Sequence, residues 1–445
     1  MGAIVEVKYF NSFLLRKTIS KNEEVDYGVK AYLVEEEPNS SIRINTLIYS
    51  GIFNSRTGVN DTNVFSVGQN ITKSADPANG SIQKLYAEDT NLVIFQENKI
   101  SRALVNKDAI YAAEGGGTVT ASNLTIGVIQ PFPGRYGISK NPESFAVYGY
   151  DKFFTDENNN TVLKLSGGSI QEVSGFGMTD FFRDQLNNMN TTTIAGFAQG
   201  GWDIYSKQYV VSIYKNPIEF PGLLADGTDD PEQYKTLSFD GGVSGWTTFF
   251  SYKPDQILSL RDKLYTLKNG TIWQHYADNV GSLRGNFYDV NTRSSLTFVF
   301  NPQVTNSKTF KTINYEGSNG WQVDSIISDA AGQDLFNTTY ELTDDQSALI
   351  YSYTEGQYDL AGNVYPAQLT QPIYYAGFDR KENKYVANLI NNSDAAQGEI
   401  LFGASISGIK GYYVTATMST DLVTNLGAEK QLFSVGTNYN MNSGF

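Results

Sequence analysis

Short runs of apolar and aromatic residues alternate with polar positions along most of this chain, and Asn, Asp and Gly interrupt the runs at short intervals. The clearest example lies between Ser144 and Asp180. The pattern there predicts strands at Ser144–Tyr148, Val162–Leu165 and Ile170–Val173, and turns at Asp156–Asn160 and Gly167-Gly168. Asn, Asp and Gly adopt the positive φ angles of tight hairpin turns, and β-branched and aromatic residues favour strands. The segment therefore has the outline of one antiparallel blade of a β-propeller.

Three other stretches repeat this outline. They are Leu85–Leu104, Gly201–Tyr214 and Leu258–Tyr276, and the last contains Asn269-Gly270, the strongest hairpin signal in the chain. The four segments begin at residues 85, 144, 201 and 258, in nearly constant steps of 59, 57 and 57 residues. A constant step indicates a repeat architecture, although these steps exceed the roughly 40 to 50 residues of familiar propeller blades. The pattern predicts a propeller or a propeller-like ring of blades, with an irregular series of β-sandwiches as the alternative.

The pattern divides the chain into three parts. Residues 1–44 carry alternating apolar positions and predict N-terminal strands in a docking segment. Residues 45–293 are predicted to form the propeller-like domain of repeated antiparallel blades. The character of the sequence shifts at Ser294, where a run typical of a buried strand begins, so residues 294–445 are predicted to form a separate C-terminal β-domain.

The C-terminal part also carries predictions of particular turns and pairings. Turn residues are predicted at Asn314, Glu316, Asn319 and Gly320, and a hairpin is predicted at Pro372–Asn392 with its tip at Arg380–Asn383. Ile409–Met418 is predicted to be a strand that pairs with Gln431–Val435. Because a terminal strand pair with unpaired edges invites partners, we expect this domain to contact neighbouring subunits or an adaptor protein.

The composition supports an all-β chain and narrows its chemistry. Among 445 residues there are 29 Tyr, 26 Phe and 41 Gly, and few Leu-rich helical periods. There is no cysteine, which excludes disulfides and thiolate metal sites. No signal peptide and no apolar run of 18 residues is present, so the sequence predicts a soluble protein assembled in a cytoplasm, without membrane insertion.

The net charge of −14 and the pI of about 4.7 argue against specific binding of nucleic acid, which needs clustered Lys and Arg. The excess of acidic residues has two interpretations. It keeps an abundant protein soluble, or it forms the wall of a conduit to which passing DNA does not adhere.

No set of residues predicts catalysis. The single histidine, His275, lies in a strand pattern beside Trp273 and Tyr276, so pairs of His ligands for zinc are excluded. The run from Asp156 to Asn160 resembles the start of an EF-hand loop, but Thr161 stands at position 6 and Gly167 at position 12, where Gly and Glu are required. Gly115-Gly116-Gly117 lacks the Lys-Ser/Thr that follows a phosphate-binding loop. We therefore predict no catalytic, cofactor-binding or metal-binding residue, and no enzymatic activity.

The aromatic residues offer two interpretations. The tryptophans and the paired tyrosines could form a sugar-binding platform, or they could fill the core between sheets and anchor subunit interfaces. The residues concerned are Trp202, Trp246, Trp273, Trp321, Tyr374-Tyr375 and Tyr412-Tyr413. The second interpretation is favoured.

Several long segments of the chain resemble virion structural proteins of tailed bacteriophages, in the crAss-like group and in contractile-tailed marine phages. The segments that carry the resemblance are Val5–Phe13, Ile48–Gly68, Gly80–Gly115, Ser144–Asp184, Lys263–Tyr276 (KLYTLKNGTIWQHY) and Phe310–Trp321 (FKTINYEGSNGW), followed by IKGYYVTATMSTD and KQLFSV near the C-terminus. The resemblance implies a component of the tail and supplies no catalytic residues.

The resemblance leaves the position in the tail open. One possibility is a hub or nozzle subunit that contains a β-propeller and closes the DNA channel as a cyclic homo-oligomeric ring. It would then contact adaptor or portal-proximal proteins. A baseplate or fibre-bearing position fits equally well. The alternative function is an adsorption protein that binds host surface glycans through exposed aromatic residues.

Overall fold

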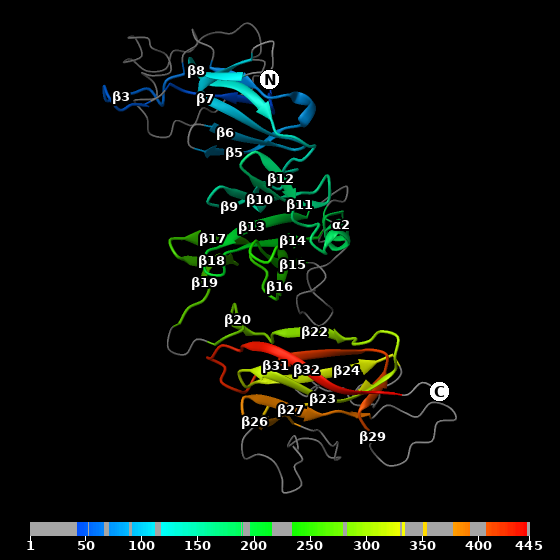
Figure 1. The fold of residues 1–445 in the computed structure, drawn as a ribbon. Coiled ribbons are helices and arrows are strands. Elements are labelled where there is room, and N and C mark those ends of the chain that lie inside the picture. The colour runs from blue at the N-terminus through cyan, green and yellow to red at the C-terminus, as the bar shows by residue number, and fades with distance from the viewer. Residues whose placement is uncertain are drawn as a thin grey trace, which may run out of the picture. The chain divides into compact units, whose positions relative to one another are not determined.

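The computed structural model describes residues 42–51, 53–65, 71–88, 91–111, 117–187, 189, 196–215, 234–278, 283–329, 332–333, 350–353, 377–391 and 406–442. The predicted strands before residue 42 lie outside these ranges. The chain divides into two compact units, residues 1–276 and 277–445 (Figure 1). The division falls at 276/277, whereas the sequence pattern changes at 293/294, and the intervening segment packs with the second unit. The described residues form an all-β protein with one α-helix, α2 (Thr179–Asn187).

Among the described residues of the first unit, four larger antiparallel sheets follow one another along the chain. Each is a meander in which sequential strands are neighbours. The strands are β5 (Ile82–Glu88), β6 (Asn91–Gln96), β7 (Ile100–Tyr111) and β8 (Gly117–Pro131); β9 (Ala146–Tyr148), β10 (Asp151–Asp156), β11 (Thr161–Ser166) and β12 (Ser169–Glu172); β13 (Phe197–Asp203), β14 (Gln208–Tyr214), β15 (Tyr234–Asp240) and β16 (Gly245–Phe250); and β17 (Gln256–Leu260), β18 (Lys263–Lys268) and β19 (Thr271–Gln274). Before them lie two short pairs, β1 (Thr46–Ile48) with β4 (Thr72–Ser74) and β2 (Phe53–Asn54) with β3 (Val59–Asn60).

The four predicted repeats correspond to these four sheets. In the segment that begins at Ser144, four strands replace the three predicted, because the chain turns once more at Gly149 (φ +59°) between β9 and β10. Both predicted turns are present, and Asn160 and Gly167 have φ angles of +54° and +58°. Residues that accept a left-handed backbone therefore end these strands where the sequence indicates.

Apolar cores join each sheet of the first unit to the next. One core lies between the β5–β8 and β9–β12 sheets, and it contains Phe95, Phe154 and Leu163. A second core includes α2 and joins the β9–β12 and β13–β16 sheets through Phe153 and Tyr209. A third joins β14 and β16 to the β17–β19 sheet. Among the described residues no core cluster joins the first sheet to the last, so the all-β prediction is confirmed and no closed propeller is observed.

Strand β13 passes unusually close to its neighbours because it contains adjacent glycines. A Cβ atom on Gly200 would overlap the carbonyl oxygen of Ser144, and a Cβ atom on Gly201 would overlap the side chain of Ile257. The hydroxyl of the fully buried Tyr209 donates a hydrogen bond of 2.7 Å to the same Ser144 oxygen. Because Gly200 and Gly201 have no side chains, the neighbouring segments can pack closely against both sides of β13 at this point.

The second unit is a β-sandwich. One sheet has the order β22-β31-β24-β25, and in the other β23 pairs with β32 on one edge and with β27 and β30 on the other. The strands are β22 (Ser295–Phe300), β23 (Lys308–Gly317), β24 (Trp321–Ser328), β25 (Gly332–Gln333), β26 (Asp379–Lys381), β27 (Lys384–Asn388), β30 (Ile409–Gly411), β31 (Val414–Thr420) and β32 (Leu432–Met441), with the small pairs β20 (Asn286–Phe287) and β21 (Val290–Asn291), and β28 (Ile390–Asn391) and β29 (Ile406–Ser407).

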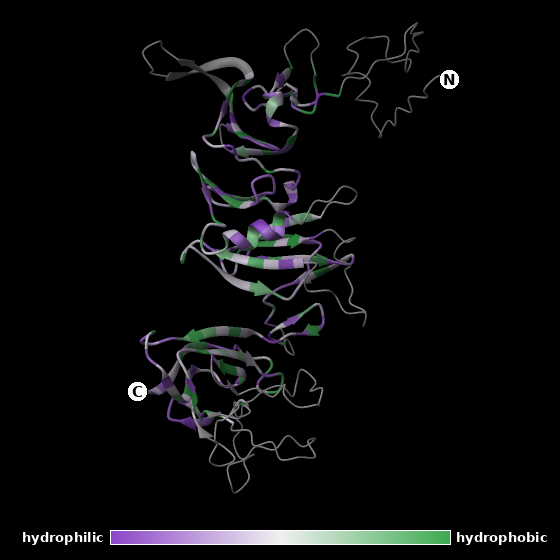
Figure 2. Cartoon of the chain, turned by 90° about the vertical axis from the view of Figure 1, so that its right-hand side faces the viewer, coloured by the Kyte–Doolittle hydropathy of each residue, from purple (hydrophilic) through white to green (hydrophobic). Residues whose placement is uncertain are grey.

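Alternating residues of the two sheets fill the sandwich core. Phe310, Ile313 and Tyr315 of β23 face Val323 of β24 and Met418 of β31. The alternation breaks between Phe310 and Ile313, where the register of β23 shifts against β32. A bulge at this point returns the following side chains to the core. Hydrophobic and hydrophilic positions alternate in the same manner along strands of both units (Figure 2).

Two predictions for the second unit are wrong and two are confirmed. Asn314 and Glu316 lie inside β23 and not in a turn, and the strand that follows Ile409 pairs with β22 and β24 instead of with residues 431–435. Both edges of β31 are occupied, so β32 joins the opposite sheet. The turn at Asn319-Gly320 and the hairpin tip near Glu382 (φ +56°) are confirmed.

Candidate functional site

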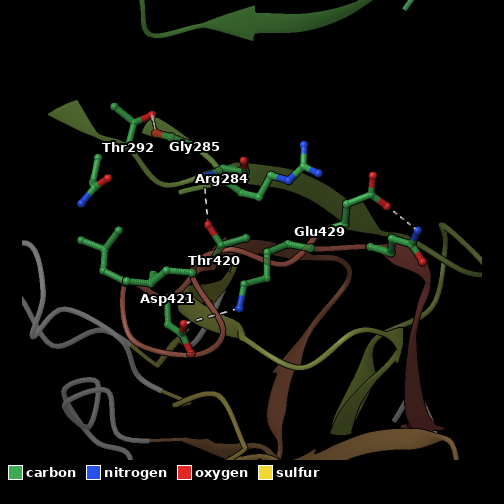
Figure 3. A pocket seen from close by; sticks show the side chains of 12 residues that line it. Arg284, Gly285, Thr292, Thr420, Asp421 and Glu429 are labelled. Atoms are coloured by element: carbon green, nitrogen blue, oxygen red, sulfur yellow. Dashed lines mark hydrogen bonds and ion pairs between the residues drawn. The ribbon is translucent and has the colours of Figure 1, made fainter. Parts of the chain in front are cut away.

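The second unit contains a cavity of about 280 Å³ at the end of the sandwich, where the β20–β21 hairpin meets the connection between β31 and β32 (Figure 3). The backbone N–H of Arg284 donates to the carbonyl of Leu426 (2.8 Å), and that of Thr292 donates to Gly285 (2.8 Å). The lining residues are Arg284, Gly285, Asn291, Thr292, Ser294, Thr420, Asp421, Leu422, Leu426, Glu429, Lys430 and Gln431.

Asp421 is the best-connected side chain of this cavity. It is 8% exposed, and its Oδ1 accepts hydrogen bonds from the N–H groups of Val423 (3.2 Å) and Thr424 (2.8 Å). Its Oδ2 accepts from the hydroxyls of Thr424 (2.5 Å) and Ser352. A carboxylate that accepts four hydrogen bonds fixes the turn after β31 and ties it to the segment at residue 352.

Lys430 crosses beneath the turn between β23 and β24. Its Nζ lies 3.9 Å from Oδ1 of Asp421 and donates hydrogen bonds to the carbonyls of Asn319 (3.3 Å) and Thr424. Burial lowers the pKa of Lys430 below its ordinary value, while the charge of Asp421 acts in the opposite direction. Gly320 has a φ of +105°, and a Cβ atom there would overlap the ammonium group, so glycine is required above this lysine.

The polar groups of the cavity bind other groups of the protein and so hold segments of the sandwich together. Arg284 forms an ion pair with Asp278 (2.9 Å), and Glu429 accepts a hydrogen bond from Gln431 (3.0 Å). The charged groups are thus engaged with protein partners, and the buried pair Asp421–Lys430 connects three segments of the sandwich. This pair was not predicted from the sequence, although Asp421 followed by Thr424 is a pattern typical of turns closed by a side chain.

The structure places His275 just after β19, in a half-buried position. Its Nε2 lies 2.7 Å from Oγ1 of Thr266 in a hydrogen-bond contact, and its ring packs against Tyr252 at a centroid distance of 5.0 Å. Burial lowers the pKa of His275 to about 4, although the nearby charge of Asp203 acts in the opposite direction. The side chain is therefore held neutral and packed at neutral pH.

We expect the first unit to lose about 3 kcal/mol of stability through His275 as the pH falls from about 6.5 to about 4. The unfolded histidine binds a proton below about 6.5, whereas the folded one resists protonation down to about 4, so acid favours the unfolded state. Hydrogen exchange of the β17–β19 strands at several pH values measures the loss. The His275→Gln variant cannot titrate and should show a shallower pH dependence, whereas parallel profiles would contradict the prediction.

The side chain of Asp156 fixes the turn that follows β10. The buried Asp156 carboxylate accepts hydrogen bonds from the N–H of Gly137 (3.0 Å), the hydroxyl of Ser139 (3.0 Å) and the amide of Asn159 (2.7 Å). Burial raises the pKa of Asp156. Within the described ranges no group of three or more His, Asp or Glu side chains is placed to hold a metal ion.

Trp202 and Trp246 both pack against the core that joins the β9–β12 and β13–β16 sheets. Trp202 stacks on Tyr148 (centroids 4.4 Å apart), Trp246 donates to the carbonyl of Val173 (3.0 Å), Trp273 lies on β19, and Trp321 is 6% exposed in the sandwich core. Tyr412 and Tyr413 are exposed, whereas Tyr374-Tyr375 lies outside the described residues. The described aromatic residues mainly join sheets.

A comparison with protein families matches part of the second unit. Residues 282–392 match the family model of the crassvirus muzzle protein C-terminal domain. This match covers about a quarter of the chain, and among described elements it extends from β20 to β28. It supports a structural protein of a crassvirus virion, in agreement with the resemblance to phage virion proteins. No curated protein matches the chain.

The match does not include β31 and β32, which complete the sandwich. It contains the β20–β21 side of the cavity, and Asp421 and Lys430 lie beyond its end. Among the described helices none is long and apolar enough to cross a membrane.

Proposed function

We propose that this chain is a tail subunit of a crassvirus particle, of the muzzle or nozzle type, which forms a ring with copies of itself around the path of the DNA. The observation that carries the proposal is the match of residues 282–392 to the muzzle protein C-terminal domain. In this proposal the protein acts mechanically, through assembly with adaptor or portal-proximal proteins in the host cytoplasm, and catalyses no reaction.

The charge of the chain suits such a position. At a net charge of −14, a ring of subunits would carry a strongly negative lining. DNA phosphates are repelled by such a surface, so DNA would pass without adhering to the wall. In such a ring each protomer places two different surfaces against its two neighbours.

The location of the chain in intact virions tests this proposal. We expect peptides of the chain in purified particles, and cryo-electron microscopy should show its two units as a closed ring on the tail axis. Density at the tip of a peripheral fibre, or absence of the chain from the particles, would contradict the proposal. Deletion of the gene, with the chain supplied in trans as the control, should yield particles that lack the distal tail.

A further inference from the structure

The β17–β19 sheet ends the series of packed sheets in the first unit, and its two faces are both apolar. On the inner face, Ile257 and Leu264 pack against Val210 of β14 and Phe250 of β16. The other face, here called the outer face, consists of the side chains that alternate with them. Its apolar and aromatic residues are Leu258, Leu260, Tyr265, Leu267 and Ile272, and the polar Gln256, Lys263 and Gln274 lie on the same face.

Strand pairing places the outer-face residues together. Leu258 lies opposite Tyr265, and Leu267 lies opposite Ile272, so the side chains of each pair are neighbours on one surface. Leu258, Leu260 and Ile272 are 42%, 65% and 68% exposed. Strands β17 and β19 thus present large aliphatic side chains to solvent, and Tyr265 and Leu267 of β18 lie half-buried between them.

The preceding sheets of this unit show where a sheet with apolar side chains on both faces lies. In the β9–β12 sheet, Phe154 and Leu163 enter the core shared with the preceding sheet, while Phe153 and Val162 enter the core shared with the following one. A sheet that is apolar on both faces is therefore an internal sheet here. Terminal repeats of stacked architectures normally carry a polar outer face. The β17–β19 sheet lacks one, and it has the pattern of a sheet that is covered.

The charge around the outer face differs from the charge of the chain. Residues 251–276 contain four basic side chains, Lys253, Arg261, Lys263 and Lys268, and two acidic ones, Asp255 and Asp262. This segment therefore has an excess of two positive charges in a chain whose net charge is −14. Arg261 and Asp262 lie in the β17–β18 turn, and Lys263 lies opposite Leu260 at the rim of the outer face. Neither Arg261 nor Lys263 forms an ion pair with a described residue. Lys268 faces the other side of the sheet, where its Nζ lies 3.9 Å from Oδ1 of Asp255.

We propose that the outer face of the β17–β19 sheet is a self-association surface, which docks on an acidic surface of a second copy of this chain. The inference rests on the proposed function, because a ring subunit needs such a contact. A surface with apolar side chains at its centre and basic side chains at its rim is complementary to an acidic surface of another protein. A second copy can supply such a surface, since outside residues 251–276 the chain carries a net charge of −16.

The sign of the rim also determines the kind of contact. Two outer faces brought together would place like charges opposite each other, which is unfavourable. The outer face therefore docks on a different surface of its neighbour, as a heterologous contact. Contacts of this kind close into rings when the rotation between neighbours permits.

Paired substitutions on the intact chain test the surface. Leu260→Glu with Ile272→Glu places two carboxylates on the outer face, and Val304→Glu with Val423→Glu places two on exposed apolar positions (66% and 86%) of the second unit. We expect the first pair to raise the dissociation constant of self-association at least tenfold in sedimentation experiments. The second pair should leave it within about twofold. Thermal unfolding must be unchanged in both variants, because all four side chains face solvent.

A cross-linking experiment identifies the occupant. The chain has no cysteine, so Ile272→Cys creates a unique attachment site for a photoreactive probe. In a mixture of isotopically light and heavy chains, we expect hybrid cross-links that join residue 272 to an acidic surface of the other copy. Cross-links confined to one chain, or self-association that survives the outer-face substitutions, would overturn the proposal. A wild-type chain that remains monomeric at about 100 µM would overturn it too, whereas the proposed function is judged separately by the position in the virion.

Discussion

Gly200→Ala should destabilise the first unit by about 3 kcal/mol or more, although it adds a single methyl group. The added carbon would overlap the carbonyl oxygen of Ser144 and lie 2.8 Å from the hydroxyl of Tyr209. Neither atom can move freely, because Tyr209 is fully buried and its hydroxyl donates to that same oxygen. The substitution therefore separates β13 from the segment before β9 and leaves a buried hydroxyl without its partner.

Denaturant unfolding of the full chain, followed by tryptophan fluorescence, measures this effect. Three of the four tryptophans, Trp202, Trp246 and Trp273, report on the first unit. Gly241→Ala is the matched control, since a Cβ atom there meets no other atom within 4 Å. If Gly200→Ala unfolded at the same denaturant concentration as Gly241→Ala, the close packing of β13 would not be a determinant of stability.

Asp421→Ala should destabilise the second unit by about 3 kcal/mol. The change leaves the N–H groups of Val423 and Thr424 without their acceptor and removes the only carboxylate within 4 Å of the Lys430 ammonium group among the described residues. An uncompensated charge with 12% of its side chain exposed is costly, because little solvent reaches it.

The double variant Asp421→Ala with Lys430→Met separates the two contributions. It removes the unpaired charge, so it should recover about half of the lost stability, while the turn after β31 stays weakened. Hydrogen exchange of β31 and β32 in the full chain provides the measurement, with the first-unit strands as an internal reference. Equal stability of the single and the double variant would show that hydrogen bonds to the carbonyls of Asn319 and Thr424 are enough to stabilise the ammonium group of Lys430.

Turns and pairings between residues near in sequence were predictable, whereas pairings between residues far apart in sequence were not. The Asn160 and Gly167 turns follow from the backbone preferences of those residues, and four meanders follow from short-range alternation. The sandwich pairings were missed because Ser295 pairs with Ser419 and Lys308 with Met441, more than 120 residues away, and no local pattern specifies them. The bulge before Ile313 also hides the alternation of β23.

The candidate site was predictable only in part. The sequence marks Gly320 as a turn residue, but nothing in it indicates that Lys430 lies under that turn. The close packing at Gly200 was likewise invisible, since glycine in a strand carries no information about what approaches it. The sequence places His275 in a strand pattern beside Trp273 and Tyr276 but does not say what it contacts, and the structure places it against Tyr252 and Thr266.

The order of strand pairing has a consequence for synthesis on the ribosome. Every described sheet of the first unit pairs strands that are near in sequence, so each can form soon after its residues leave the exit tunnel. The sandwich differs, because β22 pairs with β31 and β23 pairs with β32, and both partners are synthesised more than 100 residues later. The second unit, part of which matches the muzzle domain, therefore completes both of its sheets only after translation has passed residue 441, and until then its unpaired strand edges are exposed to aggregation.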